Sequence, residues 1–297
     1  MGLTKTSIKL ICTLPDPIVS GQKLTATCAV DNWGVTMFIL KSKGSASDNK
    51  KYPISIIKVS KFTTTPTIKV ITVKKNCKEL GNCALHANSL CYARKEGESK
   101  GSLYVTTGNP KDKVQVIKMN SSGVVEQELY RYDIYGNKAK VSNLTFYGNI
   151  NGKMYFITCI GYSSEGRLKY KLMEFDGSKF QDIRTIFSGA VTKDTGYSRN
   201  DITYKEGKLY HTFFKKNSKG IIYKNKIYVY DISSLTTLTG QVVEPIEILY
   251  SEAPKEYNKK YELEGVITYQ GNIYAAGNME SSNASKNKDS VFKITRK

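Results

Sequence analysis

The stretch ELEGVITYQGNIYAAGN at 262–278 contains two runs rich in strand-forming residues, joined by a short turn and headed by polar side chains. Val, Ile and Tyr occupy both runs, which is typical of paired β-strands. The Gln-Gly-Asn turn at 270–272 supplies the glycine that tight hairpin connections favour. The segment therefore predicts an antiparallel hairpin whose first strand begins with charged residues.

Four other segments of the chain resemble this hairpin. They are GQKLTATCAVDNWGVTMFILK at 21–41, HANSLCYARKEGESKGSLYVTT at 86–107, SNLTFYGNINGKMYFITC at 142–159 and SRNDITYKEGKLYHTFF at 198–214. When the five copies are aligned on their first polar inner position, successive copies lie 54 to 66 residues apart, at Gln22, Asn88, Ser142, Asn200 and Glu264. Self-similarity at such a period indicates a repeat architecture.

Each of the first four hairpins is followed by two more strand-like runs, whereas the last is followed by one, at 290–297. The run SIKLICTLP at 7–15 precedes the first hairpin and supplies the missing strand. No segment has a sustained helical period of apolar residues. The sequence therefore predicts an all-β chain in a single domain, a five-bladed β-propeller of four-stranded blades closed by the N-terminal strand. The predicted blade cores are roughly 21–75, 86–133, 142–187, 198–250 and 262–297 with 7–15.

The chain is strongly basic, with 45 Lys and Arg against 26 Asp and Glu in 297 residues and a formal charge of +19. Such an excess favours anionic partners, although lysines on solvated strand edges explain part of it. The sequence has no signature of a nucleic-acid-binding module, so nucleic acid is not an expected partner. No stretch is apolar for long enough to span a membrane.

The N-terminus has no apolar core of the kind that marks a classical signal peptide. We therefore expect a protein that is secreted without such a signal, or one that is cytoplasmic until release. The sequence does not predict an oligomeric state.

The polar heads of the inner strands predict a binding site at one mouth of the central channel. Alternate residues of a strand share a face, so His86 should point the same way as Asn88, and Glu262 the same way as Glu264. Convergent polar groups in a concave site are the usual mark of ligand binding. The predicted ligand-binding residues are Gln22, His86, Asn88, Ser198, Asn200, Glu262 and Glu264.

The evidence for catalysis is weaker, and no catalytic residue is assigned. The strand rise places the side chains of Glu262 and Glu264 about 7 Å apart, a spacing that suits hydroxyl recognition as well as glycoside cleavage. His86 heads an inner strand and titrates near neutral pH, whereas His211 lies in mid-strand and is predicted to be packed. No serine lies in a nucleophile-elbow motif.

The six cysteines do not form a disulfide framework. Cys12, Cys28, Cys91 and Cys159 lie in apolar strand patterns and are predicted to be core residues. Cys77 and Cys83 flank a loop and either pair or remain free. A zinc site at Cys77, Cys83, His86 and Cys91 would have wider spacing than structural zinc sites usually have, so no metal and no cofactor are expected.

HANSLCY at 86–92, ELEGVITYQGNIYAAGN at 262–278 and GQKL at 21–24, with ESSNASKNKDS at 280–290 and VFKIT at 291–295, resemble segments of the helveticin J family of large heat-labile bacteriocins. The third repeat, around Ser142, departs from this pattern. The resemblance implies a secreted propeller that acts on other bacteria, with no established enzymatic chemistry.

The leading interpretation is a non-catalytic, bacteriocin-like antimicrobial propeller. Its carbohydrate-binding site would take a cell-surface glycan or a teichoic-acid-like polyanion. The alternative is a propeller hydrolase or lyase that acts on a polysaccharide through His86 with Glu262 or Glu264. A third possibility is an interaction protein whose faces bind another protein.

Overall fold

The computed structural model describes residues 3–43, 50–85, 87–192, 195–234, 239–283, 287 and 289–297. Within these ranges every regular element is a β-strand, so the all-β prediction is confirmed. The same ranges contain no helix that is long and apolar enough to cross a membrane.

The longer strands form antiparallel groups of four, which we number units 1 to 5 in chain order. Unit 1 contains β4 (Ala26–Trp33), β5 (Thr36–Ser42), β6 (Ser55–Ser60) and β7 (Thr67–Thr72). Unit 2 contains β10 (Leu90–Ala93), β11 (Ser102–Thr106), β12 (Val116–Asn120) and β13 (Val125–Leu129). Unit 3 contains β16 (Thr145–Ile150), β17 (Lys153–Tyr162), β18 (Arg167–Phe175) and β19 (Phe180–Val191).

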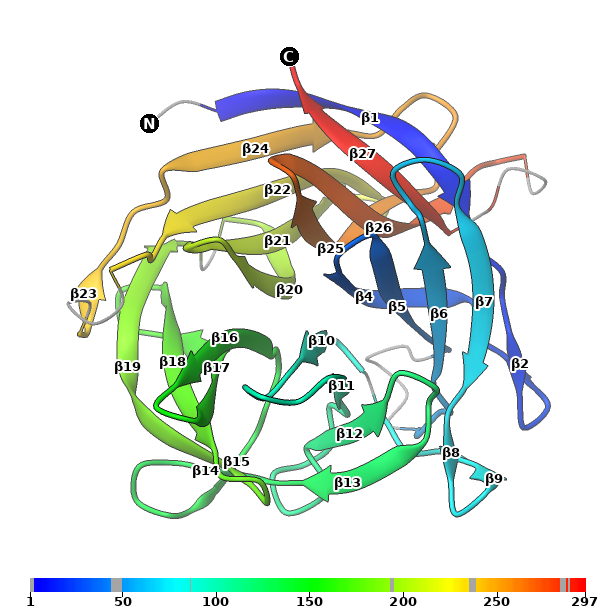
Figure 1. Cartoon of the computed structure of the whole chain (residues 1–297). Helices are drawn as coiled ribbons and strands as arrows, with labels where there is room; N and C mark the ends of the chain where they lie inside the picture. Colours follow the sequence, from blue (N-terminus) through cyan, green and yellow to red (C-terminus); the bar gives the residue numbers. More distant parts are fainter. Residues whose placement is uncertain are drawn as a thin grey trace.

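Unit 4 contains β20 (Tyr197–Lys205), β21 (Lys208–Lys216), β22 (Ile222–Asp231) and β24 (Glu247–Glu252). Unit 5 contains β25 (Lys260–Tyr269), β26 (Asn272–Glu280), β27 (Ser290–Arg296) and the N-terminal β1 (Leu3–Thr13). The remaining short strands lie outside these groups: β2 (Ile18–Val19), β3 (Gln22–Lys23), β8 (Lys74–Lys75), β9 (Lys78–Glu79), β14 (Arg131–Tyr132), β15 (Lys138–Ala139) and β23 (Gln241–Val242). Figure 1 shows the units arranged around a common centre.

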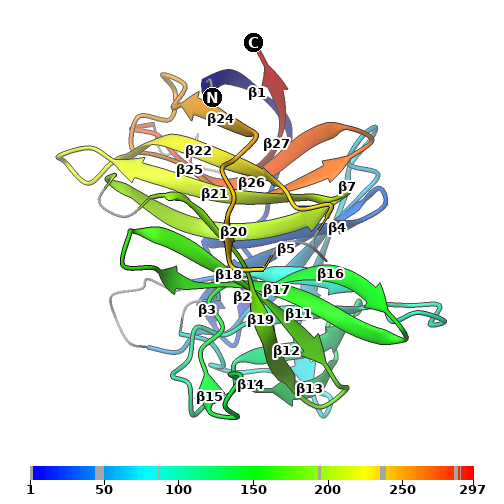
Figure 2. The ribbon, with the colours of Figure 1, turned by 90° about the vertical axis from the view of Figure 1, so that its left-hand side faces the viewer.

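The first and last strands of the chain lie side by side. β1 pairs antiparallel with β27 from Thr6↔Arg296 to Thr13↔Ser290. Its first residues also pair parallel with β24, beginning at Leu3↔Ile248. The sheets of units 4 and 5 are thereby joined, and both chain ends lie together (Figures 1 and 2). The sequence predicts this pairing, because unit 5 otherwise lacks an outer strand.

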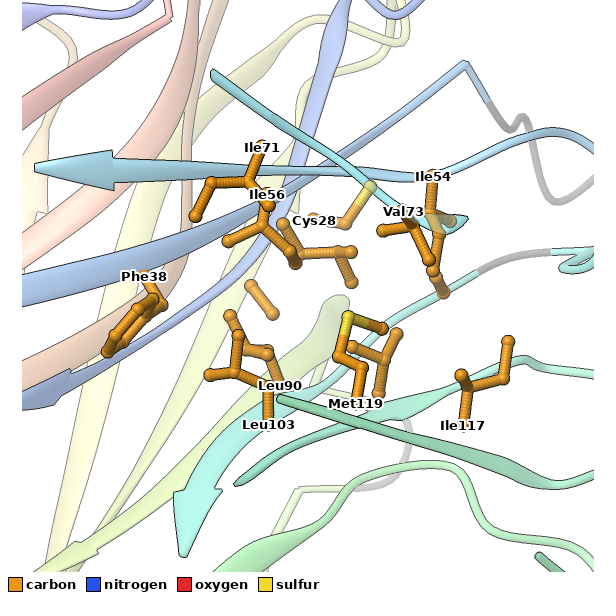
Figure 3. Close-up of a cluster of buried hydrophobic side chains, with 14 of the residues drawn as sticks. Cys28, Phe38, Ile54, Ile56, Ile71, Val73, Leu90, Leu103, Ile117 and Met119 are labelled. Carbon is orange, nitrogen blue, oxygen red and sulfur yellow. The ribbon is translucent and has the colours of Figure 1, made fainter. Parts of the chain in front are cut away.

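The hydrophobic core is divided among the gaps between units. One cluster packs Phe38, Ile56 and Ile71 of unit 1 against Leu103 and Met119 of unit 2 (Figure 3). The other clusters join units 2 and 3, 3 and 4, 4 and 5, and 5 and 1 in the same way. Each sheet therefore buries both faces against its neighbours, which explains the near-continuous burial of strands such as β5 and β10.

Polar side chains join the inner strands around the ring. The strands β4, β10, β16, β20 and β25 contact one another in this cyclic order. Ser89 Oγ donates to Leu144 O at 2.9 Å, and Asn143 Nδ2 donates to Asn200 O at 2.7 Å. Asp31 Oδ2 accepts from Tyr92 N at 2.7 Å. Because the inner edge of each sheet has backbone groups without a strand partner, these side chains satisfy them and fix neighbouring units together.

Candidate functional site

Glu262 and Glu264 lie where β25 is interrupted by a β-bulge. Leu263 pairs with Gly277 and Gly265 with Ala276, so Glu264 is the extra residue on the bulged strand. A bulge of this kind redirects a side chain that strict alternation would send elsewhere. Gly277 makes the close approach possible, since a Cβ at that position would lie 2.2 Å from Glu262 O.

The two glutamates form an interacting pair rather than the separated pair that regular strand geometry predicts. Glu262 is buried, and its Oε2 lies 3.0 Å from Lys260 Nζ. Glu264 Oε1 accepts a hydrogen bond from Asn278 Nδ2 at 2.5 Å. Burial, and then the charge of Glu262, hold the pKa of Glu264 well above its ordinary value. The bulge therefore places a carboxyl whose raised pKa favours the protonated form beside one that is paired with a lysine.

Burial lowers the pKa of Lys260, but the neighbouring Glu262 and Glu264 outweigh it and hold the pKa above the ordinary value. Lys260 therefore remains a cation. Its Nζ forms an ion pair with Glu262 Oε2 at 3.0 Å.

A third carboxyl, that of Asp289, is connected to this pair by hydrogen bonds. Thr27 N donates to Asp289 Oδ2 at 2.9 Å and to Asn278 Oδ1 at 2.7 Å. The fully buried Lys41 ammonium forms an ion pair with Asp289, and it also lies 3.0 Å from Asp16 Oδ1. Burial raises the pKa of Asp289 above its ordinary value, and the opposing effects of Lys41 and Thr27 offset this only in part. Lys41 therefore favours the ionised form of Asp289.

A cavity of about 380 Å³ opens beside these carboxyls, within the size range of small-molecule sites. We call it the mouth cavity. Its walls include Lys260 and Asn278, the partners of the two glutamates, and Asp289 itself. The lining residues are Asp16, Lys23, Thr25, Ala26, Lys260, Asn278, Met279, Glu280, Asn287 and Asp289.

A second group of buried carboxyls, those of Asp31 and Asp201, lies on the inner strands of units 1 and 4. Asp201 Oδ1 accepts from Ser89 Oγ at 2.5 Å, and burial raises its pKa well above the ordinary value. Asp31 Oδ1 lies 3.0 Å from Lys205 Nζ. A Cβ on Gly265 would lie 3.6 Å from Asp201 Cβ, so β20 and β25 are in close contact here. These carboxyls hold the inner strands together.

The structure places the other predicted binding residues as follows. Asn200 lies beside the glutamate pair, because its Nδ2 donates to Leu263 O at 3.0 Å. Asn88 is half-buried just before β10, and Ser198 is exposed on β20 opposite Phe214. His86 lies outside the described residues.

Gln22 lies on β3 and is therefore not on an inner strand. Ser20 and Gly21 both have positive φ and close a separate hairpin between β2 and β3. The Gln22 side chain donates to Asn82 Oδ1 at 3.0 Å. The inner strand of unit 1 begins only at Ala26.

His211 is packed, as the sequence predicts. It is fully buried, its Nδ1 lies 2.6 Å from Tyr170 Oη, and burial lowers its pKa well below the ordinary value. His211 is therefore neutral in the folded protein.

The cysteines are free thiols. Cys28, Cys91 and Cys159 are buried as predicted, and Cys12 is half-buried. Cys77 is exposed and unpaired, while burial raises the pKa of the Cys83 thiol to about 12. In the described part of the chain no three His, Cys, Asp or Glu side chains gather as a metal site.

Sequence reasoning missed Lys41, Asn278 and Asp289. Asn278 ends the quoted hairpin and Lys41 ends the first one, but strand alternation gives no signal that their side chains meet. Asp289 lies 248 residues from Lys41. Only the ring closure of units 5 and 1 brings them together.

No family model matches the chain, and no curated protein matches it. Among solved structures, the chain is similar to that of a BT0996 complex with RGII, with 11% identity, 99% of this chain and 93% of that protein covered, and a TM-score of 0.54. It is similar to the exo-β-1,3-galactanase from Phanerochaete chrysosporium with galactose, with 9% identity, 96% and 64% coverage, and a TM-score of 0.51.

It is also similar to CoXyl43, a GH43 β-xylosidase/α-arabinofuranosidase from a compost microbial metagenome with xylotriose, with 11% identity, 98% and 95% coverage, and a TM-score of 0.49. At such identities the likeness to the BT0996 complex and to the galactanase shows a shared fold.

These comparisons correct the functional interpretation. The non-catalytic, antimicrobial, bacteriocin-like role is wrong, because the galactanase that shares the fold is by name a carbohydrate-cleaving enzyme. The resemblance to the helveticin J family is tested by none of the comparisons and stays a prediction. The alternative interpretation, an enzyme acting on a polysaccharide, agrees better with the fold.

Proposed function

We propose that this chain is a five-bladed β-propeller that hydrolyses glycosidic bonds of a polysaccharide at the mouth cavity. Each of units 1 to 5 would be one blade, and the cyclic contacts of the inner strands support that count. The observation that carries the functional proposal is the glutamate pair on the bulge of β25, next to an open cavity and a third carboxyl.

Glu264 is suited to act as the general acid. Glycoside cleavage needs one protonated carboxyl that donates to the leaving oxygen and one carboxylate that acts on the opposite side. Burial and the adjacent Glu262 raise the pKa of Glu264 well above its ordinary value and so favour its protonated form. Asn278 orients the acid through its hydrogen bond to Oε1.

Asp289 is suited to act as the carboxylate. It lines the mouth cavity and forms an ion pair with Lys41. As the bond between the anomeric carbon and the glycosidic oxygen breaks, Glu264 gives its proton to the leaving oxygen. Water adds its hydroxyl to the anomeric carbon and its proton passes to Asp289. Both halves of the reaction are thus assigned to side chains linked through Asn278 and Thr27.

The test is release of reducing sugars from a panel of galactan, arabinan, xylan and a glycosylated teichoic acid, whose sugar substituents are attached by glycosidic bonds. A teichoic-acid-like polymer is the narrower partner that the positive charge favours, and the panel compares it with neutral glycans. We expect Glu264→Gln to lower the rate by about 100-fold or more, because it removes the proton donor. The matched control is Glu98→Gln on an exposed loop. Equal activity of the two variants, or no cleavage of any polymer, would contradict the proposal.

A further inference from the structure

A basic and aromatic surface lies at one end of unit 4. In one cross-strand row Tyr197 pairs with Lys215, and Lys215 with Lys224. In the next row of the same face, Lys226 lies between Phe213 and Tyr250. Directly paired residues share a face of the sheet. We call this face the lysine–tyrosine patch; its members are Tyr197, Arg199, Lys215, Lys224, Lys226 and Tyr250.

The lysines of the patch gather around tyrosine rings. Lys226 Nζ lies 4.4 Å and Lys215 Nζ 5.5 Å from the centroid of the Tyr197 ring. Lys224 Nζ lies 5.7 Å from the Tyr250 ring centroid. A cation above an aromatic face is attracted by the ring quadrupole. Tyr197 thus holds two ammonium groups over one ring.

The patch has fewer negative charges than positive ones. Glu252 lies 3.1 Å from Lys224 and accepts a hydrogen bond from Tyr250. Among the ion pairs of the described residues, none includes Lys215 or Lys226. Burial, and then the charges of Lys215 and Lys224, lower the pKa of Lys226. An anion bound here would relieve the repulsion between the two lysines.

The patch lies on the face of unit 4 that packs against unit 3, at the end of the sheet that also pairs with unit 5. Asn200 follows Arg199 on β20 and donates to the carbonyl of Leu263, the residue between the two glutamates. At the same end of the sheet, Ile222 of β22 pairs with Lys260. A polymer that extends from the mouth cavity across this end of unit 4 would reach Tyr197.

We propose that the lysine–tyrosine patch is a subsite for the carboxylate of a uronic acid residue, so that the substrate is an anionic polysaccharide. The inference rests on the proposed function. Lys215 and Lys226 donate to the carboxylate, and Tyr197 holds the two ammonium groups in place. Both Nζ atoms lie within 5.5 Å of the centroid of the Tyr197 ring, so the two donors belong to one small area of the surface.

The test compares the binding of polygalacturonate with the binding of its methyl-esterified form, which has the same sugar without the charge. Binding is measured by affinity electrophoresis or calorimetry at about 50 and about 300 mM NaCl, which differ in electrostatic screening. The variants are Lys215→Gln with Lys226→Gln, and Lys215→Arg with Lys226→Arg. The matched control is Lys69→Gln with Lys78→Gln, an equal charge change on exposed strands of unit 1 and its neighbour β9.

We expect the patch glutamine variant to bind polygalacturonate about tenfold or more weakly, since two charge-assisted hydrogen bonds are lost. The arginine variant should retain binding, the control should match the wild type, and the esterified polymer should bind weakly to all. Thermal unfolding verifies that each variant is folded. An equal loss in the patch and control variants would overturn the proposal, because it would mean that general charge attracts the polymer.

Two further polymers exclude other sources of the anion. Patch-dependent binding of dextran sulfate or of a single-stranded oligonucleotide, at least as tight as that of polygalacturonate, would also overturn the proposal. Failure of the two proposals can be distinguished, because binding needs no cleavage. If polygalacturonate binds through the patch but no polymer is cleaved, the subsite proposal stands and the hydrolase proposal fails. If neutral polymers are cleaved without preference for polygalacturonate, the hydrolase proposal stands and the subsite proposal fails.

Discussion

Asn200 of β20 donates its side-chain amide to the carbonyl of Leu263 on β25 at 3.0 Å. Leu263 stands between the two glutamates of the candidate site, immediately before the bulge. The same bond that joins unit 4 to unit 5 therefore also positions the acidic pair. The sequence marks Asn200 as a ligand-binding residue, and the structure gives it this positioning contact.

Replacing Asn200 by alanine should weaken both the ring and the site. The Leu263 carbonyl would lose its partner, at a cost of about 1–3 kcal/mol in the free energy of unfolding. Urea denaturation measures the loss, and Ser198→Ala at an exposed position of the same strand is the control. An Asn200→Ala variant as stable as Ser198→Ala would show that the bond contributes nothing.

Replacing Gly277 by alanine should disturb the bulge of β25. The new Cβ would meet Glu262 O at 2.2 Å, and the strands would have to separate. We expect a loss of about 1–3 kcal/mol in stability, typical of overpacking, and lower hydrolytic activity. Gly81→Ala is the control, since no atom lies within 4 Å of a Cβ there and its φ is not positive. Equal stability of the two variants would contradict the close approach of the strands.

Glu264 should make the folded state more stable in acid than in base. Its pKa is raised in the folded protein, so folding favours the protonated form. That stabilisation is complete below the unfolded pKa of about 4.3 and is lost as the pH rises toward the folded value. The difference in unfolding free energy between wild type and Glu264→Gln, measured by denaturation from acid to neutral pH, should therefore fall as the pH rises. A difference that does not change with pH would mean that the carboxyl is not perturbed.

The buried pair of Lys41 and Asp289 should tolerate joint replacement better than single replacement. Lys41→Met leaves the Asp289 carboxylate buried without its cation, which typically costs about 3–5 kcal/mol. Changing Asp289→Asn in the same chain removes that charge and should recover part of the loss. Chemical denaturation of the two variants provides the comparison. If the double variant is no more stable than Lys41→Met, the ion pair does not account for the effect.

Hydrolytic activity gives a second test of the variant that carries both Lys41→Met and Asp289→Asn. Asp289 is the proposed carboxylate of the reaction, so the double variant should remain inactive even where it regains stability. Recovery of hydrolysis together with stability would remove Asp289 from the mechanism while leaving the ion pair intact.

The repeated hairpins predict the strands well because each hairpin is local. The period-2 pattern and the turn glycines are enough to identify β25 with β26 and β20 with β21. The pairing of β1 with β27 follows from a count of strands. In each case the hydrophobic pattern and the fold agree.

The site is harder to predict because it depends on departures from regularity. The alternation rule sends Glu262 and Glu264 to the same face with about 7 Å between them, whereas the bulge brings their carboxyls together. The hairpin at Ser20 and Gly21 removes Gln22 from the inner strand. Lys41 and Asp289 meet only after the ring has closed, so no local pattern reveals them.

The position of β1 also constrains how the protein folds. Its antiparallel partner, β27, is made of residues 290–296. This pairing, which we call the seam, therefore joins segments separated by nearly the whole chain. On the ribosome, β1 must wait until the final strand has emerged, while units 1 to 4 can already fold one after another. Such distant contacts slow folding. A circular permutant that links Lys297 to Leu3, whose strands already lie side by side, and opens the exposed turn around Gly97 would make this seam local. Faster refolding of the permutant would identify seam formation as the slow step in assembling the ring.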